Sequence, residues 1–176
     1  MKAMISNRAL NNKLQKVSLF VTDFDGVHTN GLVVVNQDGV ESVSCSRKDG
    51  LGVLMLKRHQ IEFVVISKET NRVVLERCNK IGARCFHKVS DSTGKLEILR
   101  RLVDESGLAA ENVLYMGDDV NDRACLEFAG VAVTVADGHK SLLSICDYVT
   151  KGRGGEHVIR EVVEMLLQAK GYAIVY

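Results

Sequence analysis

Two carboxylates stand directly after the first strongly apolar segment of the chain. Asp23 and Asp25 are two residues apart in the stretch DFDGVHTNG, which follows the apolar run Val17–Thr22. This pattern fits a loop of Asx turns, because Asp and Gly are common turn residues. It also fits a nucleophile and an acid/base group that face one substrate. Like charges this close repel each other, so the catalytic interpretation requires a cation or a shared proton.

A hydroxyl and an amine occupy comparable places further along the chain. Ser67 follows the apolar run Glu62–Ile66, where its hydroxyl can either donate to a phosphate or cap the next helix. Lys95 stands at the start of the predicted helix Leu96–Glu105. A cation is unfavourable at that end of the helix dipole unless an anion lies nearby.

A cluster of oxygen-bearing side chains follows the apolar run Asn112–Met116. The stretch GDDVND places Asp118, Asp119, Asn121 and Asp122 within five residues. The ordinary explanation is a capped helix start, where Asp is favoured. Hard oxygen donors at this density also suit Mg²⁺.

The segments that carry these residues alternate between strand-like and helix-like patterns. The predicted strands are Val17–Thr22, Glu62–Ile66, Ala83–Phe86, Asn112–Met116 and Val131–Val135. The predicted helices are Leu51–His59, Asn71–Lys80, Leu96–Glu105, Asp122–Phe128 and Glu156–Ala169. Continuous apolar strands between helices predict an α/β, doubly wound (Rossmann-like) fold, with a parallel sheet and helices on both faces. Such folds bind ligands at the carboxyl ends of the strands, where the polar residues above stand.

The segment at 32–45 interrupts this alternation. Leu32–Val35 and Val40–Cys45 flank NQDG, which predicts a β-hairpin inserted after the first strand. The intervals between Asp25, Ser67 and Lys95 are too short to hold a cap domain. We therefore expect one domain over residues 1–176, with its core at about 17–168 and no cap.

Composition limits the class of protein. Lys and Arg total 23 against 22 Asp and Glu, so nothing in the charge indicates nucleic acid or a membrane surface as a partner. The five cysteines are odd in number and form no C-x-x-C pair, which predicts reduced thiols in a cytoplasmic protein. The first 16 residues lack a signal-peptide apolar stretch, and no run is long enough to span a membrane.

The order D-x-D-G, Ser, Lys and G-D-D-x-x-D resembles the haloacid dehalogenase superfamily of aspartate-nucleophile phosphatases. The resemblance covers roughly Val17 to Leu167 and implies an enzyme, a Mg²⁺-dependent phosphatase. It implies that Asp23 attacks phosphorus and binds the metal. It implies that Asp25 acts as acid and base, and binds the metal through its backbone carbonyl.

The same resemblance implies roles for the later motifs. Ser67 and Lys95 would hold the phosphoryl oxygens, and Asp118 would complete the protein ligands of the metal. Asp119 and Asp122 would support the metal or Lys95 without being metal ligands themselves.

Four stretches further resemble 3-deoxy-octulosonate 8-phosphate phosphatases, nonulosonate 9-phosphate phosphatases and the phosphatase-like domain of acylneuraminate cytidylyltransferases. They are Asp23–Gly31, Asp49–Gly52 (DGLG), Gly117–Asp122 and Gly154–Glu161 (GGEHVIRE). This resemblance implies a homotetramer in which hairpins pack together and one subunit helps cover its neighbour's site. Gly154, Gly155 and Arg160 are candidates for that cover.

The sequence departs from the octulosonate enzymes in the stretch after the second strand. Their S-G-R is replaced by Ser67-Lys68-Glu69, which is more similar to the nonulosonate or sialic-acid branch. Further differences occur at His28, at Asn30 and at Gly94, and His28 could touch substrate. The candidate substrate-binding residues are Asp25, Thr29, Lys68, Glu69 and Arg160.

Three functions follow from these patterns. The first is hydrolysis of an eight- or nine-carbon keto-sugar acid phosphate through a phosphoaspartate. The second is a tetramerisation or regulatory domain related to the cytidylyltransferases, with little or no catalysis. The third is a phosphoacceptor domain that receives phosphate from a kinase, although the D-x-D-G order and the G-D-D-x-x-D motif argue against it.

Overall fold

The computed structural model describes residues 7–90 and 92–174, and nothing is said here of residues 1–6, 91 and 175–176. Its centre is a parallel sheet in the order β5-β4-β1-β6-β7-β8. The strands are β1 (Leu19–Thr22), β4 (Glu62–Ile66), β5 (Arg84–Phe86), β6 (Val113–Gly117), β7 (Val131–Thr134) and β8 (Tyr148–Val149). The chain runs from β1 to one edge of the sheet and then returns to the other side of β1. The sheet therefore has its switch point between β1 and β6.

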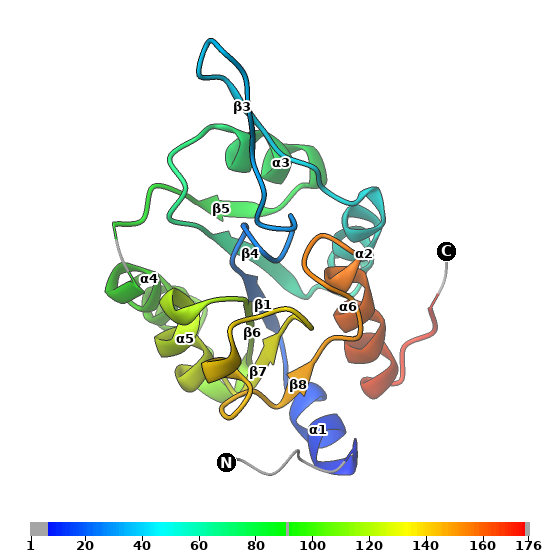
Figure 1. Cartoon of the computed structure of the whole chain (residues 1–176). Helices are drawn as coiled ribbons and strands as arrows, with labels where there is room; N and C mark the ends of the chain where they lie inside the picture. Colours follow the sequence, from blue (N-terminus) through cyan, green and yellow to red (C-terminus); the bar gives the residue numbers. More distant parts are fainter. Residues whose placement is uncertain (1–6, 91, 175–176) are drawn as a thin grey trace.

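Helices cover both faces of this sheet (Figure 1). On one face lie α1 (Asn7–Leu14), α2 (Arg47–Arg58), α3 (Val73–Ile81) and α6 (Val158–Ala169), and on the other lie α4 (Ser92–Glu105) and α5 (Arg123–Phe128). Successive residues of β1 alternate between the two cores: Phe20 packs with the first group of helices and Val21 with the second. The doubly wound α/β fold predicted from the sequence is thus confirmed.

The hairpin insertion projects from the body beside α3 (Figure 1). Its strands β2 (Val34–Val35) and β3 (Glu41–Ser42) are antiparallel, and the Nδ2 of Asn71 donates to the Glu41 carboxylate at 3.2 Å. No cap domain covers the carboxyl end of the sheet within the residues described by the structure, as the intervals between motifs predict.

Several element bounds differ from the sequence prediction. Helix α1 was missed because its polar composition hides Leu10 and Leu14, which face the core one turn apart. Strand β8 was missed because two residues are too few to show periodicity. Helix α2 starts before Leu51, since Ser46 accepts a hydrogen bond from the backbone N–H of Lys48 and caps it. Helix α4 likewise starts before Leu96, so Lys95 lies inside its first turn.

Short 3-10 turns connect the main elements at Ala110–Asn112, Val120–Asp122 and Lys140–Leu142. None of the five cysteines, all of which the structure describes, is in a disulfide, and Cys78, Cys125 and Cys146 are buried. Across the described residues, no helix combines the length and apolar character required to cross a bilayer.

Candidate active site

The candidate catalytic and metal-binding residues predicted from the sequence lie together at the carboxyl end of the sheet. Asp23 follows β1, Ser67 follows β4 and Asp118 follows β6. Because β1 pairs with both β4 and β6, these three loops are neighbours. Lys95 reaches the same place from the first turn of α4.

Asp23 is held by its neighbours on two sides. Its own backbone N–H donates to the Met116 carbonyl at 2.9 Å, which extends the β1–β6 pairing by one residue. Its Oδ1 accepts from the backbone N–H of Phe24 at 2.7 Å, and its Oδ2 lies 2.6 Å from the Nζ of Lys95. The carboxylate orientation is therefore set by the backbone and by one buried cation.

Lys95 is completely buried and bridges two carboxylates. Its Nζ lies 2.6 Å from Asp23 Oδ2 and 2.8 Å from Asp122 Oδ1. A buried ammonium is stable only when it is paired in this way. The carboxylates of Asp23 and Asp122 thus offset the unfavourable position of the Lys95 ammonium in the first turn of a helix. Burial alone would lower the pKa of Lys95, but the charges of Asp23 and Asp122 outweigh it and raise the pKa. The side chain therefore stays charged.

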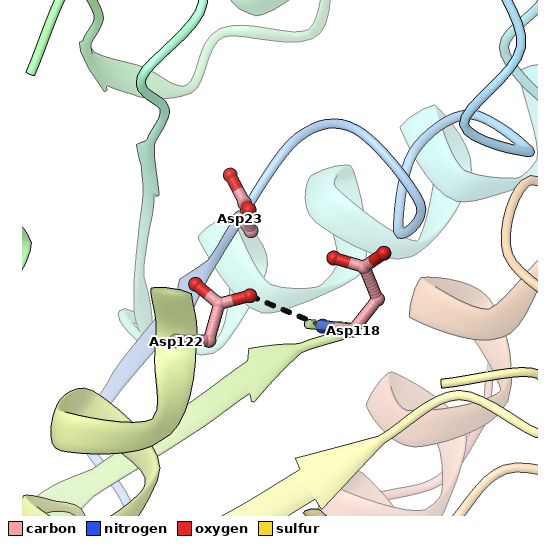
Figure 2. Close-up of side chains that lie close together, drawn as sticks. All are labelled: Asp23, Asp118 and Asp122. Atoms are coloured by element: carbon pink, nitrogen blue, oxygen red, sulfur yellow. Dashed lines mark hydrogen bonds between the residues drawn. The ribbon is translucent and has the colours of Figure 1, made fainter. Parts of the chain in front are cut away.

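Three carboxylates, those of Asp23, Asp118 and Asp122, gather in the site (Figure 2). Asp23, Asp118 and Asp122 each offer an oxygen, and these oxygens lie within 4.8 Å of one another. Asp122 is already engaged, since its Oδ2 accepts from the Asp118 backbone N–H at 3.1 Å and its Oδ1 accepts from Lys95. Asp23 and Asp118 are therefore the better candidates for metal ligands.

The crowding changes the acidity of these groups. Burial and the charge of Asp122 raise the pKa of Asp23 to about 8, despite the opposing effect of Lys95. Burial and the charges of Asp122 and Asp119 raise the pKa of Asp118 to about 7. A divalent cation would remove this penalty, so the residues present fit a hard metal such as Mg²⁺.

Gly26 allows the two acidic loops to approach each other. Its φ of +72° is one that residues with a side chain rarely adopt, and a Cβ at this position would overlap the Asp118 carboxylate. The glycine of the D-x-D-G motif thus permits both the turn after Asp25 and the close approach of Asp118.

A pocket of about 270 Å³ opens at this point. It is lined by Asp23, Asp25, Ser67, Lys68, Glu69, Thr70 and Asn121. Burial, and next the negative charge of Glu69, raise the pKa of Asp25, which favours its protonated form. Thr29 donates to Asp25 Oδ1 at 3.3 Å and so lies directly behind the acid/base candidate.

Two residues of this pocket were given no role of their own from the sequence. Thr70 and Asn121 both line it. Asn121 was noted only as one of the oxygen-bearing side chains of the GDDVND stretch, at a strand end where such folds bind ligands. Thr70 gives no comparable signal.

The remaining motif residues have local partners. The Ser67 hydroxyl accepts from the backbone N–H of Glu69 at 3.1 Å, whereas helix α3 begins only at Val73, so Ser67 is not a helix cap. Asp119 accepts from the Val120 N–H at 2.7 Å and caps the short 3-10 turn after β6. Of the two predicted supporting carboxylates, only Asp122 contacts Lys95 in the structure.

His28 does not face the pocket, which corrects the suggestion that it touches substrate. It is buried, stacks on Phe24 with ring centroids 5.2 Å apart, and shares a 3.0 Å hydrogen bond with the Thr22 hydroxyl. Burial and the nearby Arg77 charge lower its pKa to about 3, so the ring is neutral. His28 therefore belongs to the core beneath the loop.

The Gly154–Glu161 stretch packs against the molecule's own nucleophile loop. A Cβ on Gly154 would overlap the Gly26 carbonyl, and the Gly155 N–H donates to the Val27 carbonyl at 3.0 Å. Arg160 does not line the pocket, and its Nε donates to Glu164 at 2.6 Å. This stretch supports the loop of its own subunit from behind.

Comparison with protein families finds one that matches this chain. The family model described as haloacid dehalogenase-like hydrolase matches residues 51–158. The 3-deoxy-D-manno-octulosonate 8-phosphate phosphatase of Escherichia coli K12 is 34% identical over 159 residues, which cover 90% of this chain and 84% of that protein.

Two solved structures give the same picture. That of 3-deoxy-D-manno-octulosonate 8-phosphate phosphatase from Moraxella catarrhalis, in complex with magnesium, phosphate and a KDO molecule, is 28% identical with a TM-score of 0.88 and 93% coverage of both chains. The cobalt-bound Haemophilus influenzae enzyme is 30% identical with a TM-score of 0.82, covering 90% of this chain and 92% of that one.

Proposed function

The chain belongs to the haloacid dehalogenase-like hydrolases, in the group of 3-deoxy-D-manno-octulosonate 8-phosphate phosphatases, and we propose that it hydrolyses an eight- or nine-carbon keto-sugar acid phosphate through a phosphoaspartate. As a member of this family it is a phosphoric monoester hydrolase. One observation carries the proposal: the buried Lys95 contacts Asp23 at 2.6 Å, with the Asp118 carboxylate beside them. A purely structural domain has no need of this arrangement.

Each side chain has a defined part in the proposed reaction. Asp23 attacks phosphorus in line, and Asp25 protonates the departing oxygen of the sugar. Asp25 then takes a proton from the water that cleaves the phosphoaspartate. The raised pKa of Asp25 suits the first of these two steps. Ser67 and Lys95 hold the phosphoryl oxygens.

Asp23, Asp118 and the backbone carbonyl of Asp25 would hold Mg²⁺. When bound, the ion supplies positive charge that lets a carboxylate approach a phosphate dianion. The Moraxella catarrhalis relative contains magnesium, and the Haemophilus influenzae relative contains cobalt.

Substrate choice rests on the rim of the pocket. Lys68 and Glu69 line it, and Thr29 lies behind Asp25. The pair Lys68-Glu69 resembles the nonulosonate branch more than the octulosonate branch, so both chain lengths remain candidate substrates. Without a cap, exclusion of water must come from a neighbouring subunit, and we propose a homotetramer built on the hairpins. We propose that the enzyme lies in the cytoplasm, since its five described cysteines form no disulfide.

A panel of eight- and nine-carbon keto-sugar acid phosphates tests the proposal. Phosphate release is measured side by side with excess Mg²⁺ and with a chelator, and glycerol phosphate serves as the control for unselective hydrolysis. We expect Mg²⁺-dependent turnover of at least one sugar acid phosphate, faster than that of glycerol phosphate. Absence of any Mg²⁺-dependent release would favour the alternative, a tetramerisation or regulatory domain, for which the exposed apolar hairpin is the supporting observation.

A further inference from the structure

One buried polar group near the site has no part in the proposed reaction. Tyr115 lies in the middle of β6 and is completely buried among the apolar residues that face α4 and α5. Its hydroxyl donates to Asp122 Oδ1 at 2.8 Å. A tyrosine in an apolar core requires such a partner, and here the partner belongs to the active site.

The Asp122 oxygen that Tyr115 reaches is the one that also contacts Lys95. Asp122 Oδ1 therefore accepts from two donors, while its Oδ2 accepts from the Asp118 backbone. A completely buried carboxylate is costly unless donors satisfy it, and losing one of them leaves that charge partly uncompensated. Asp122 would then draw Lys95 more strongly to itself and away from Asp23.

We propose that Tyr115 is a positioning residue for phosphoryl transfer: its hydroxyl holds the Asp122 carboxylate from inside the core, and so keeps the Lys95 ammonium against Asp23. This inference rests on the proposed function, because Lys95 matters only if Asp23 accepts a phosphoryl group. Tyr115 thus extends the hydrogen-bond network of Asp23, Lys95 and Asp122 by a fourth residue, one that does not touch substrate.

The chain contains a matched control for this hydrogen bond. Tyr148, in strand β8, donates to the Glu161 carboxylate at 2.7 Å. The donor, the acceptor and the distance resemble those of Tyr115 and Asp122, but the Glu161 carboxylate accepts its further hydrogen bonds from the backbone of Lys151 and Gly152 and not from Lys95. Loss of the Tyr148 hydroxyl removes a comparable hydrogen bond without changing the network of Asp23, Lys95 and Asp122.

The test compares Tyr115→Phe with Tyr148→Phe in the full chain. Two quantities are measured: steady-state kinetics on the best substrate of the panel, and the affinity for Mg²⁺ with beryllofluoride, which mimics a phosphoryl group on an aspartate, by calorimetry. We expect Tyr115→Phe to lower kcat about tenfold, with KM changed less than about twofold, and to weaken beryllofluoride binding about tenfold. We expect Tyr148→Phe to leave both unchanged.

Other outcomes are decisive in the opposite direction. Unchanged kcat and beryllofluoride affinity in Tyr115→Phe would overturn the inference, as would an equal loss in Tyr148→Phe. If the wild type binds beryllofluoride but hydrolyses no sugar acid phosphate, the substrate proposal fails, while Tyr115 is still judged by its effect on affinity. If the wild type does not bind beryllofluoride, both fail.

A second pair of variants covers the case in which Tyr115→Phe does not fold. Asp122→Asn removes the buried charge that the Phe variant leaves unsatisfied, so the double variant with Tyr115→Phe is expected to fold. If Tyr115 acts through Asp122, the double variant binds beryllofluoride within about twofold of Asp122→Asn alone. A further tenfold loss in the double variant would overturn the inference.

Discussion

Charge crowding is the main feature of the site at the scale of single residues. Asp23, Asp118 and Asp122 are brought together around one ammonium, that of Lys95. One cation cannot neutralise three carboxylates, so burial and next the repulsion between these carboxylates raise the pKa values of Asp23 and Asp118. A divalent cation held by these carboxylates would offset the excess negative charge.

Asp23→Asn is expected to abolish turnover, by at least about a thousandfold, because an amide cannot attack phosphorus. It is also expected to alter how stability depends on pH. The pKa of Asp23 is about 8 in the folded protein against 3.8 for an ordinary Asp, so the folded state binds the extra proton between these values. The wild type should therefore lose stability as pH rises from about 4 to about 8, whereas the variant should lose less.

Thermal unfolding from pH 5 to pH 9 in a chelator, together with phosphate release in Mg²⁺, checks this prediction. Asp38→Asn, on the exposed tip of the hairpin, is the control for removing a carboxylate elsewhere. Appreciable turnover by Asp23→Asn would contradict the nucleophile assignment. A pH dependence identical to that of the wild type would contradict the buried-charge interpretation.

Sequence reasoning singled out the carboxylates and the lysine that gather in the site, Asp122 among them, but not Tyr115. Asp23, Asp118 and Lys95 stand next to strand ends or helix starts, where spacing alone marks them as unusual. Tyr115 stands inside an apolar strand, where a tyrosine is an ordinary core residue. Its role depends on which oxygen its hydroxyl meets across 2.8 Å, a distance that no local pattern encodes.

At the scale of elements, two glycine-rich stretches are explained by the contact between α2 and α6. Asp49 in the first turn of α2 accepts from the backbone N–H of Arg160 at 2.9 Å, near the start of α6. Gly52 packs against the Arg160 backbone, where a Cβ would be 3.2 Å from its Cα. The stretches DGLG and GGEHVIRE are therefore in contact. Gly154, in the second stretch, also packs against the carbonyl of Gly26 in the nucleophile loop.

The N-cap residue of α6, His157, makes no side-chain hydrogen bond to the start of the helix. Asp49 takes over this role by accepting from the backbone N–H of Arg160. Asp49→Ala is expected to lower the free energy of unfolding by about 1 kcal/mol, which at this chain length is about 2–4 °C in Tm. Asp49→Asn keeps an acceptor oxygen and should melt close to the wild type. Calorimetry of the three proteins checks this, and equal melting of the Ala and Asn variants with a large loss in both would show that the charge, not the acceptor, matters.

Element positions were predictable where periodicity was long, and less so at the ends. β4 was predicted with its observed bounds because four consecutive apolar residues, Phe63 to Ile66, follow Glu62. The start of α2 was not, because Arg47 to Gly50 carries no apolar repeat and its helicity comes from the Ser46 cap and the contact with α6. Tertiary contacts, not local propensity, decide these ends.

The hairpin is the feature that a single chain does not explain at the scale of the whole molecule. It projects from the body (Figure 1). Its apolar side chains are exposed, with Leu32 70% and Val34 69% accessible. Val33, Val35 and Val40 are exposed as well. Clustered exposed apolar side chains are typical of surfaces that bind another protein, a membrane or a ligand, and they support the homotetramer proposed above. The sequence indicated the hairpin through its turn, but what packs on it is not encoded locally.

The double variant Leu32→Lys/Val34→Lys is therefore expected to convert the proposed homotetramer into smaller species, because two buried ammonium groups per hairpin would oppose packing. Light scattering coupled to gel filtration measures the mass. Leu143→Lys, which replaces an exposed leucine of the main body, is the matched control and should leave the mass unchanged. Each released subunit keeps Asp23, Lys95 and Asp118 in place, so Mg²⁺-beryllofluoride should still bind, whereas KM for the sugar acid phosphate should rise as the neighbour's cover is lost. A wild type that is already monomeric, or a variant whose mass does not fall, would remove the hairpin from the assembly and leave substrate enclosure to the chain's own loops.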